Sequence, residues 1–132
     1  MRQFTLFCLG GGLAFLLDAG LTQAWVSLAG LDPWLARALS FPAAVTATWL
    51  FNRSITFRVA ASGSLVAEWL RYVGTQLLGL SLNLAVYALI VSVSVTVARW
   101  PALAVGAGSI VGLFANFCGA KHVAFKSRGR TL

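Results

Sequence analysis

The chain has 132 residues, of which 59% are hydrophobic and only 10% are charged, and its formal net charge is +7. Soluble domains have about 45–50% apolar and about 25% charged residues, so this composition excludes an ordinary soluble protein. One bilayer crossing needs roughly 20 apolar residues, so the length allows about four crossings and leaves no room for a separate soluble catalytic domain. We therefore expect residues 1–132 to form a single all-α integral membrane domain.

Four apolar helices are expected in chain order, over about residues 4–29, 34–52, 66–97 and 102–119. Gly30-Leu31-Asp32-Pro33 breaks the first pair, with a proline suited to the first position of the next helix. Arg99-Trp100-Pro101 is predicted to separate the third helix from the fourth. Residues 54–65 are predicted to be an exposed loop, and the polar tail is predicted to begin at Ala120.

The positions of the basic residues predict the orientation in the membrane. Lys and Arg gather at the N-terminus, in the middle loop and in the tail: Arg2, Arg53, Arg58, Arg71, Lys121, Lys126, Arg128 and Arg130. Since Lys and Arg are retained in the cytoplasm, both termini and the middle loop are predicted to be cytoplasmic, in a multi-pass protein of the cytoplasmic (inner) membrane. The same rule explains the charge of +7 without nucleic acid as a partner.

The two halves of the sequence resemble each other. Three pairs of residues lie 68 positions apart, namely Pro33 and Pro101, Arg53 and Lys121, and Phe57 and Phe125. Asp18 has a counterpart in Asn83 when a gap of three residues is allowed. Each half has two crossings, so the pattern predicts two parallel two-helix repeats, over about residues 1–60 and 66–128. The alternative is chance similarity between apolar helices.

Asp18 is an ionisable residue deep in the first helix. It lies about fourteen residues from the inner end, or ~20 Å at ~1.5 Å per residue. A charge at that depth costs at least about 2.5–3.5 kcal/mol, so the carboxylate should face protein or water. One interpretation is a group in a substrate path. The other is a structural ion pair, with Arg37 of the second helix as the nearest base, whose side chain could reach inward or snorkel outward.

Two bases and two amides complete the candidate residues. Arg53 and Lys121 end the second and fourth helices, where they suit a phosphate, although cytoplasmic anchoring alone would also place bases there. Asn83 and Asn116 lie within helices three and four and could bind polar groups of a substrate or join helices. The GxxxG element at residues 108–112 indicates close helix packing, within one chain or between chains. The single His and the Cys spacing fit no zinc site, so no metal or cofactor is expected.

The order of these motifs resembles a known family. It runs from Phe4-x-x-Phe7 and Gly10-Gly11-Gly12 to Asp18, Asn52-Arg53-x-x-Thr56-Phe57, Trp69-x-x-Tyr72-x-Gly74, Asn83, and Asn116-Phe117 ahead of Lys121 and Phe125. This pattern resembles the GtrA-like family of small four-helix membrane proteins. One departure is Thr48, where the family tends to have Asn. The resemblance implies translocation of polyprenyl-phosphate-linked sugars for cell-surface polysaccharide synthesis or glycosylation, often beside a glycosyltransferase.

The leading hypothesis is therefore a lipid-linked-sugar flippase. Arg53 and Lys121 would bind the phosphate, and Asp18, Arg37, Asn83 and Asn116 would line the path, with a homodimer enclosing the groove. The alternative is a non-transporting membrane anchor of a polyprenyl-phosphate glycosyltransferase. A small multidrug exporter fits less well, because it does not explain the matched bases or the repeat. An enzyme is not expected, since three acids, one His and two Cys give no catalytic arrangement.

Overall fold

A computed structural model describes residues 1–59, 63–93 and 101–126, with no account of the side chains of residues 101–103. The chain divides into two compact units, Met1–Ser62 and Gly63–Leu132. Each unit is a helical hairpin. The residues that the structure describes form helices and connecting turns without a strand, so the prediction of an all-α fold is confirmed.

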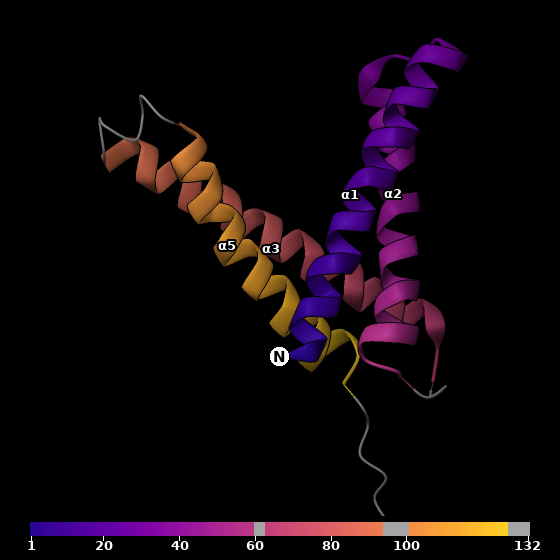
Figure 1. Cartoon of the computed structure of the whole chain (residues 1–132), viewed down its shortest axis with the longest axis vertical. Helices are drawn as coiled ribbons and strands as arrows, with labels where there is room; N and C mark the ends of the chain where they lie inside the picture. Colours follow the sequence, from indigo (N-terminus) through magenta and orange to yellow (C-terminus); the bar gives the residue numbers. More distant parts are fainter. Residues whose placement is uncertain (60–62, 94–100, 127–132) are drawn as a thin grey trace, which may run out of the picture. The chain divides into compact units, whose positions relative to one another are not determined.

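The first hairpin consists of α1 (Arg2–Ala29) and α2 (Pro33–Phe51), which pack side by side (Figure 1). α1 ends at Gly30, whose backbone is left-handed (φ 63°), a conformation that glycine adopts without steric cost. Asp32 then caps α2, because its Oδ1 accepts the backbone N–H of Trp34 at 2.9 Å and of Leu35 at 3.4 Å. Pro33 is the first residue of α2, so the break predicted at residues 30–33 is confirmed.

The second hairpin consists of α3 (Leu65–Val93) and α5 (Pro101–Gly119), which also lie side by side (Figure 1). The predicted beginning of the third helix differs from the observed one by a single residue. α5 begins at its proline, as α2 does. Two predictions lie outside the described residues: the continuation of the third helix to residue 97 and the break at Arg99 and Trp100.

Each hairpin ends in a single turn of π-helix, η1 (Asn52–Thr56) after α2 and η2 (Ala120–Ala124) after α5. Phe57 donates its N–H to the carbonyl of Asn52 at 2.8 Å, and Phe125 donates to Ala120 at the same distance. The predicted loop at 54–65 and the tail from Ala120 therefore start too early. Polar residues made these segments look exposed, but the chain keeps its helical hydrogen bonds and buries one residue at each end of both turns.

Three of the described helical segments are long and apolar enough to cross a membrane: Arg2–Ala29, Leu65–Val93 and Ala104–Ala124. α2 does not join them, because its 19 residues include Arg37, two prolines and several hydroxyl side chains. A multi-pass membrane protein is thus supported by three spans. The fourth crossing and the cytoplasmic location of the termini stay predictions.

The two hairpins share local geometry at corresponding positions. An aromatic residue early in the first helix contacts the phenylalanine after the π-turn in both: Phe7 and Phe57 at 6.4 Å between ring centroids, and Tyr72 and Phe125 at 5.5 Å. The prolines, the π-turns and these phenylalanines all recur after 68 residues. The shared turn and ring contact lie at positions that the predicted repeat relates, and the two-repeat organisation stays a prediction.

Candidate functional site

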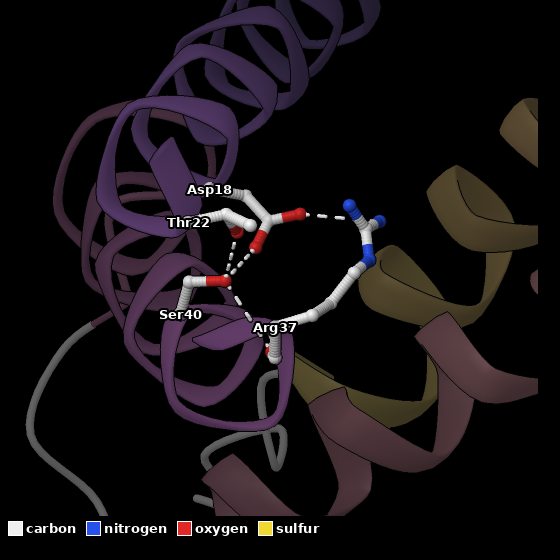
Figure 2. A network of polar contacts seen from close by, with 4 residues as sticks. All are labelled: Asp18, Thr22, Arg37 and Ser40. Carbon is white, nitrogen blue, oxygen red and sulfur yellow. Dashed lines mark hydrogen bonds and ion pairs between the residues drawn. The ribbon is translucent and has the colours of Figure 1, made fainter. Parts of the chain in front are cut away.

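Asp18 lies at the centre of a polar network inside the first hairpin (Figure 2). Its side chain comes from α1 and the residue is only 8% exposed. One carboxylate oxygen, Oδ2, lies 3.2 Å from Nη2 of Arg37 on α2. The other, Oδ1, accepts a hydrogen bond of 2.6 Å from the hydroxyl of Ser40, which is fully buried. Both oxygens of this deep carboxylate are therefore occupied by groups from the facing helix.

The Ser40 hydroxyl has one proton, and the acceptor to which it points decides which of the neighbouring groups donates to Ser40. A short bond to a carboxylate is stronger than a bond to a neutral oxygen, so Ser40 donates to Asp18. Ser40 and Thr22 lie 2.7 Å apart, and Thr22 is then the donor. The contact from Ser40 to the backbone carbonyl of Arg37, at 3.3 Å, is the weaker arm of the same donor. We call Asp18, Thr22, Arg37 and Ser40 the Asp18 cluster.

The Arg37 side chain connects the cluster to the surface of the hairpin. It is 62% exposed, whereas the Asp18 side chain is 11% exposed. A guanidinium has five N–H donors, and the contact with Asp18 uses one nitrogen. The remaining donors can bind a second anion or a hydroxyl without breaking the ion pair. The ion pair considered between Asp18 and Arg37 is thus present in the structure. A role of the two residues in a substrate path stays a prediction.

Sequence reasoning missed Ser40 and Thr22. Both were detectable, because side chains four residues apart share one face of a helix and those three apart are near it. Thr22 lies four residues after Asp18, and Ser40 lies three residues after Arg37. Pairing the two helices through Asp18 and Arg37 would have placed both hydroxyls at the same crossing.

Replacing Ser40 by alanine should destabilise the first hairpin by about 1–2 kcal/mol, because Asp18 loses a donor and Thr22 loses its acceptor. Reversible unfolding in bicelles would measure the change. Ser81→Ala is the matched control, since Ser81 is exposed and donates only to the Leu77 carbonyl of its own helix. Equal losses in the two variants would contradict the proposed hydrogen-bond order.

The same crossing in the second hairpin contains Asn83 of α3 and Gly108 of α5. Gly108 corresponds to Ser40 and Asn83 to Asp18 in the repeat. A Cβ added at Gly108 would lie 2.5 Å from the backbone oxygen of Asn83, and one added at Gly112 would lie 2.8 Å from the Gly79 oxygen. The GxxxG element of α5 therefore packs within the hairpin, directly against α3.

Asn116 lies further along the same interface and contacts Gly79 of α3. Its Oδ1 is buried and has no hydrogen-bond partner among the described residues. Most buried polar atoms are hydrogen-bonded, so this one is unusual. Its counterpart Thr48 is satisfied, because it donates to the Ala44 carbonyl at 2.7 Å. Asn116 thus has an unsatisfied acceptor that is enclosed between α3 and α5.

Arg53 and Lys121 occupy the second position of η1 and η2, respectively. Arg53 is half-buried, and Lys121 is exposed with its Nζ 5.9 Å from the centroid of the Phe117 ring. A cation above an aromatic face is held in place with little loss of its capacity to bind an anion. The structure therefore gives both predicted phosphate ligands the same place within their own hairpins.

The three acids of the chain lie in different segments of the sequence. Asp18 is buried in α1, Asp32 caps α2, and Glu68 is buried near the start of α3. Within residues 1–59, 63–93 and 101–126, no three His, Cys, Asp or Glu residues are grouped so that they could hold a metal ion. The Asp18 cluster offers hydrogen bonds and an ion pair.

Comparison with known proteins identifies the family. The model of the GtrA/DPMS transmembrane domain matches residues 6–130, which include every candidate residue discussed above. A comparison with curated proteins gives no match. The family match covers nearly the whole chain and confirms the resemblance inferred from the order of its motifs. The chain belongs to the GtrA/DPMS transmembrane-domain family.

Proposed function

We propose that the protein moves a polyprenyl-phosphate-linked sugar across the cytoplasmic membrane, for cell-surface polysaccharide synthesis or glycosylation. Membership of the GtrA/DPMS family associates the chain with the handling of lipid-linked sugars, and three apolar spans support its place in a membrane. The observation that carries the proposal is the Asp18 cluster, a buried carboxylate with two hydroxyls and a guanidinium where α1 and α2 pack together.

An ion pair in such a position is an expensive way to hold two helices together. A charge in the bilayer centre costs about 2.5–3.5 kcal/mol on insertion scales, and glycine contacts achieve helix packing without that cost. The second hairpin does pack in that way, through Gly108 and Gly112. The first hairpin keeps a charged cluster at the same crossing, which favours a role in binding polar groups of a substrate.

Substrate hydroxyls would exchange with the donors and acceptors of both hairpins. Arg37 keeps donors beyond its contact with Asp18, and the buried Oδ1 of Asn116 lacks a partner in the described structure. Asn83 is half-buried at the crossing with Gly108 and offers a further amide. These groups can take the place of the water that hydrates a sugar. This lowers the free-energy barrier to moving the sugar through the hydrocarbon core.

The phosphate would be bound by Arg53 and by Lys121, each at the cytoplasmic end of its hairpin. Arg supplies a fork of donors and Lys a point charge, and both suit phosphate oxygens. Arg37, predicted near the outer end of its helix, would receive the phosphate on the other side. The polyprenyl tail would stay in lipid throughout. Because four helices enclose little volume, we further propose that two copies associate to complete the path.

Reconstitution in liposomes tests this function. The purified chain should accelerate transfer of a fluorescent polyprenyl-phosphate sugar between leaflets, followed by its access to a membrane-impermeant quencher. Arg53→Gln and Lys121→Gln should each slow transfer about tenfold, the cost of losing one charge-assisted hydrogen bond of about 1.4 kcal/mol. Arg71→Gln is the control, because Arg71 is an exposed base of α3 that takes no part in the proposed path.

Absence of transfer with several sugars over a range of pH would contradict the proposal. The remaining interpretation is a non-transporting partner that anchors a polyprenyl-phosphate glycosyltransferase through its basic cytoplasmic segments. That alternative predicts copurification with the enzyme, which Asp18→Asn would leave intact.

A further inference from the structure

A pocket of about 150 Å³ lies at one end of the first hairpin, between the start of α1 and the end of η1. Seven residues line it: Arg2, Gln3, Leu6, Ile55, Thr56, Phe57 and Arg58. Two of its bases come from separate segments, Arg2 from the first turn of α1 and Arg58 from the chain that follows η1. The pocket is thus a product of the π-turn, which brings residues 55–58 back against α1.

Neither arginine is neutralised. Arg2 and Arg58 are exposed, and within the described part of the chain neither has a hydrogen-bond or ion-pair partner. Among the described residues that line the pocket, two are arginines and none is acidic. Two unpaired guanidiniums beside one small cavity match the charge and the fork geometry of a phosphate group.

The other residues that line this pocket distinguish it from a site for free inorganic phosphate. Leu6, Ile55 and Phe57 are apolar, and the side chain of Ile55 is 45% exposed. Gln3 adds an amide beside the arginines. Charged and apolar walls on one pocket suit a ligand in which a phosphate is joined directly to a hydrocarbon chain.

We propose that this pocket binds the phosphate of a lipid, with Arg2 and Arg58 as its ligands and the apolar walls against the first carbons of the chain. The proposal adds a phosphate contact that is separate from Arg53, which does not line the pocket. It rests on the proposed function only in taking the lipid to be a polyprenyl phosphate. A phospholipid headgroup offers the same chemistry, so the experiment must distinguish the two sources.

Binding is measured on the full chain in phosphatidylcholine nanodiscs, by native mass spectrometry of the bound-lipid fraction. The probes are a polyprenyl monophosphate, the matching polyprenol without phosphate, and phosphatidylglycerol. Arg2→Gln and Arg58→Gly should each weaken binding of the monophosphate about tenfold, while Arg71→Gln, which removes an exposed base outside the pocket, should change it less than twofold.

The choice of glycine guards against misfolding. Arg58 has a positive φ of 50°, which glycine adopts more readily than arginine, so Arg58→Gly removes the guanidinium without straining the backbone. A melting temperature equal to that of the native chain would show that the loss of binding is local.

The outcomes separate the possibilities. Binding of the monophosphate that exceeds binding of polyprenol and phosphatidylglycerol, and that falls in both pocket variants, supports a lipid-phosphate site for a polyprenyl phosphate. Equal binding of phosphatidylglycerol with the same losses supports the phosphate site and assigns it to bulk anionic lipid. Unchanged binding in the pocket variants, or an equal loss in Arg71→Gln, overturns the inference. Retained binding without transfer in liposomes would refute the proposed function alone.

Discussion

Gly108→Ala should destabilise the second hairpin by about 1–3 kcal/mol, the usual cost of forcing an extra carbon into a packed interface. The new Cβ would lie 2.5 Å from the backbone oxygen of Asn83, which cannot rotate away as a side chain would. α3 and α5 would have to separate along the crossing. Denaturant-induced unfolding in micelles would measure the loss, followed by the fluorescence of Trp69 on α3 with the other four tryptophans replaced by phenylalanine.

Gly106→Ala is the matched control, because it lies two residues away on the same helix and a Cβ there meets nothing within 4 Å. That variant should keep its stability or gain up to about 1 kcal/mol, since alanine is the better helix former. Gly112→Ala should resemble Gly108→Ala, because its Cβ would lie 2.8 Å from the Gly79 oxygen. If Gly108→Ala were as stable as Gly106→Ala, the described packing of α3 against α5 would be wrong.

The helix boundaries were predictable where one residue type has one structural role. Gly30 supplies the left-handed residue, Asp32 the cap and Pro33 the first helical position, and each acts through local geometry alone. Such signals need no knowledge of tertiary contacts, which explains why the turn was predicted correctly.

The ends of the hairpins were not predictable in the same way. Arg53 and Ser54 look like loop residues, yet they lie within a π-turn whose first and last residues, Asn52 and Thr56, are buried. Thr56, 4% exposed, donates its hydroxyl to the side chain of Asn52, and Phe57 packs on Phe7. The contact between Phe57 and Phe7 of the facing helix holds this segment in place. A local pattern of polar residues does not reveal such a contact.

The candidate site was only partly predictable for a related reason. An unpaired carboxylate deep in a membrane costs free energy, and this cost alone identified Arg37 as the partner of Asp18. Hydroxyl groups need no partner on another helix, because Ser and Thr can bond to their own helix, as Thr46 does with the carbonyl of Pro42. The register of α1 against α2 is what brings Ser40 into the cluster, and the sequence alone does not give that register.

The repeat keeps the position of this close contact but exchanges the helix that supplies the small residue. In the first hairpin Gly10 of α1 accommodates the ring of Phe51, whose Cδ1 would lie 2.7 Å from an added Cβ. At the corresponding crossing of the second hairpin the small residue is Gly119 of α5, and Thr75 of α3 fills the space. Either arrangement pairs a glycine with a larger residue, so packing constrains the two residues together and not each one alone.

Packing therefore does not require charge at the next crossing, where the second hairpin has Asn83 and Gly108 in place of Asp18 and Ser40. Asp18→Asn should consequently leave the protein folded, because asparagine has the same shape and its carbonyl oxygen can still accept from Ser40. Transfer of the lipid-linked sugar in liposomes should fall more than tenfold, since Arg37 loses the anion that holds it at the hairpin surface.

A double-mutant cycle with Arg37→Gln separates structure from transport. Arg37→Gln alone leaves Asp18 unpaired and should cost about 2 kcal/mol, less than the 3–5 kcal/mol of a fully buried pair because the Arg37 side chain is 62% exposed. Adding Asp18→Asn removes the unpaired charge and should restore most of that stability. Transport should not return, because the double variant has the fold but neither charge. Recovery of transport together with stability would instead mean that the ion pair only holds α1 against α2.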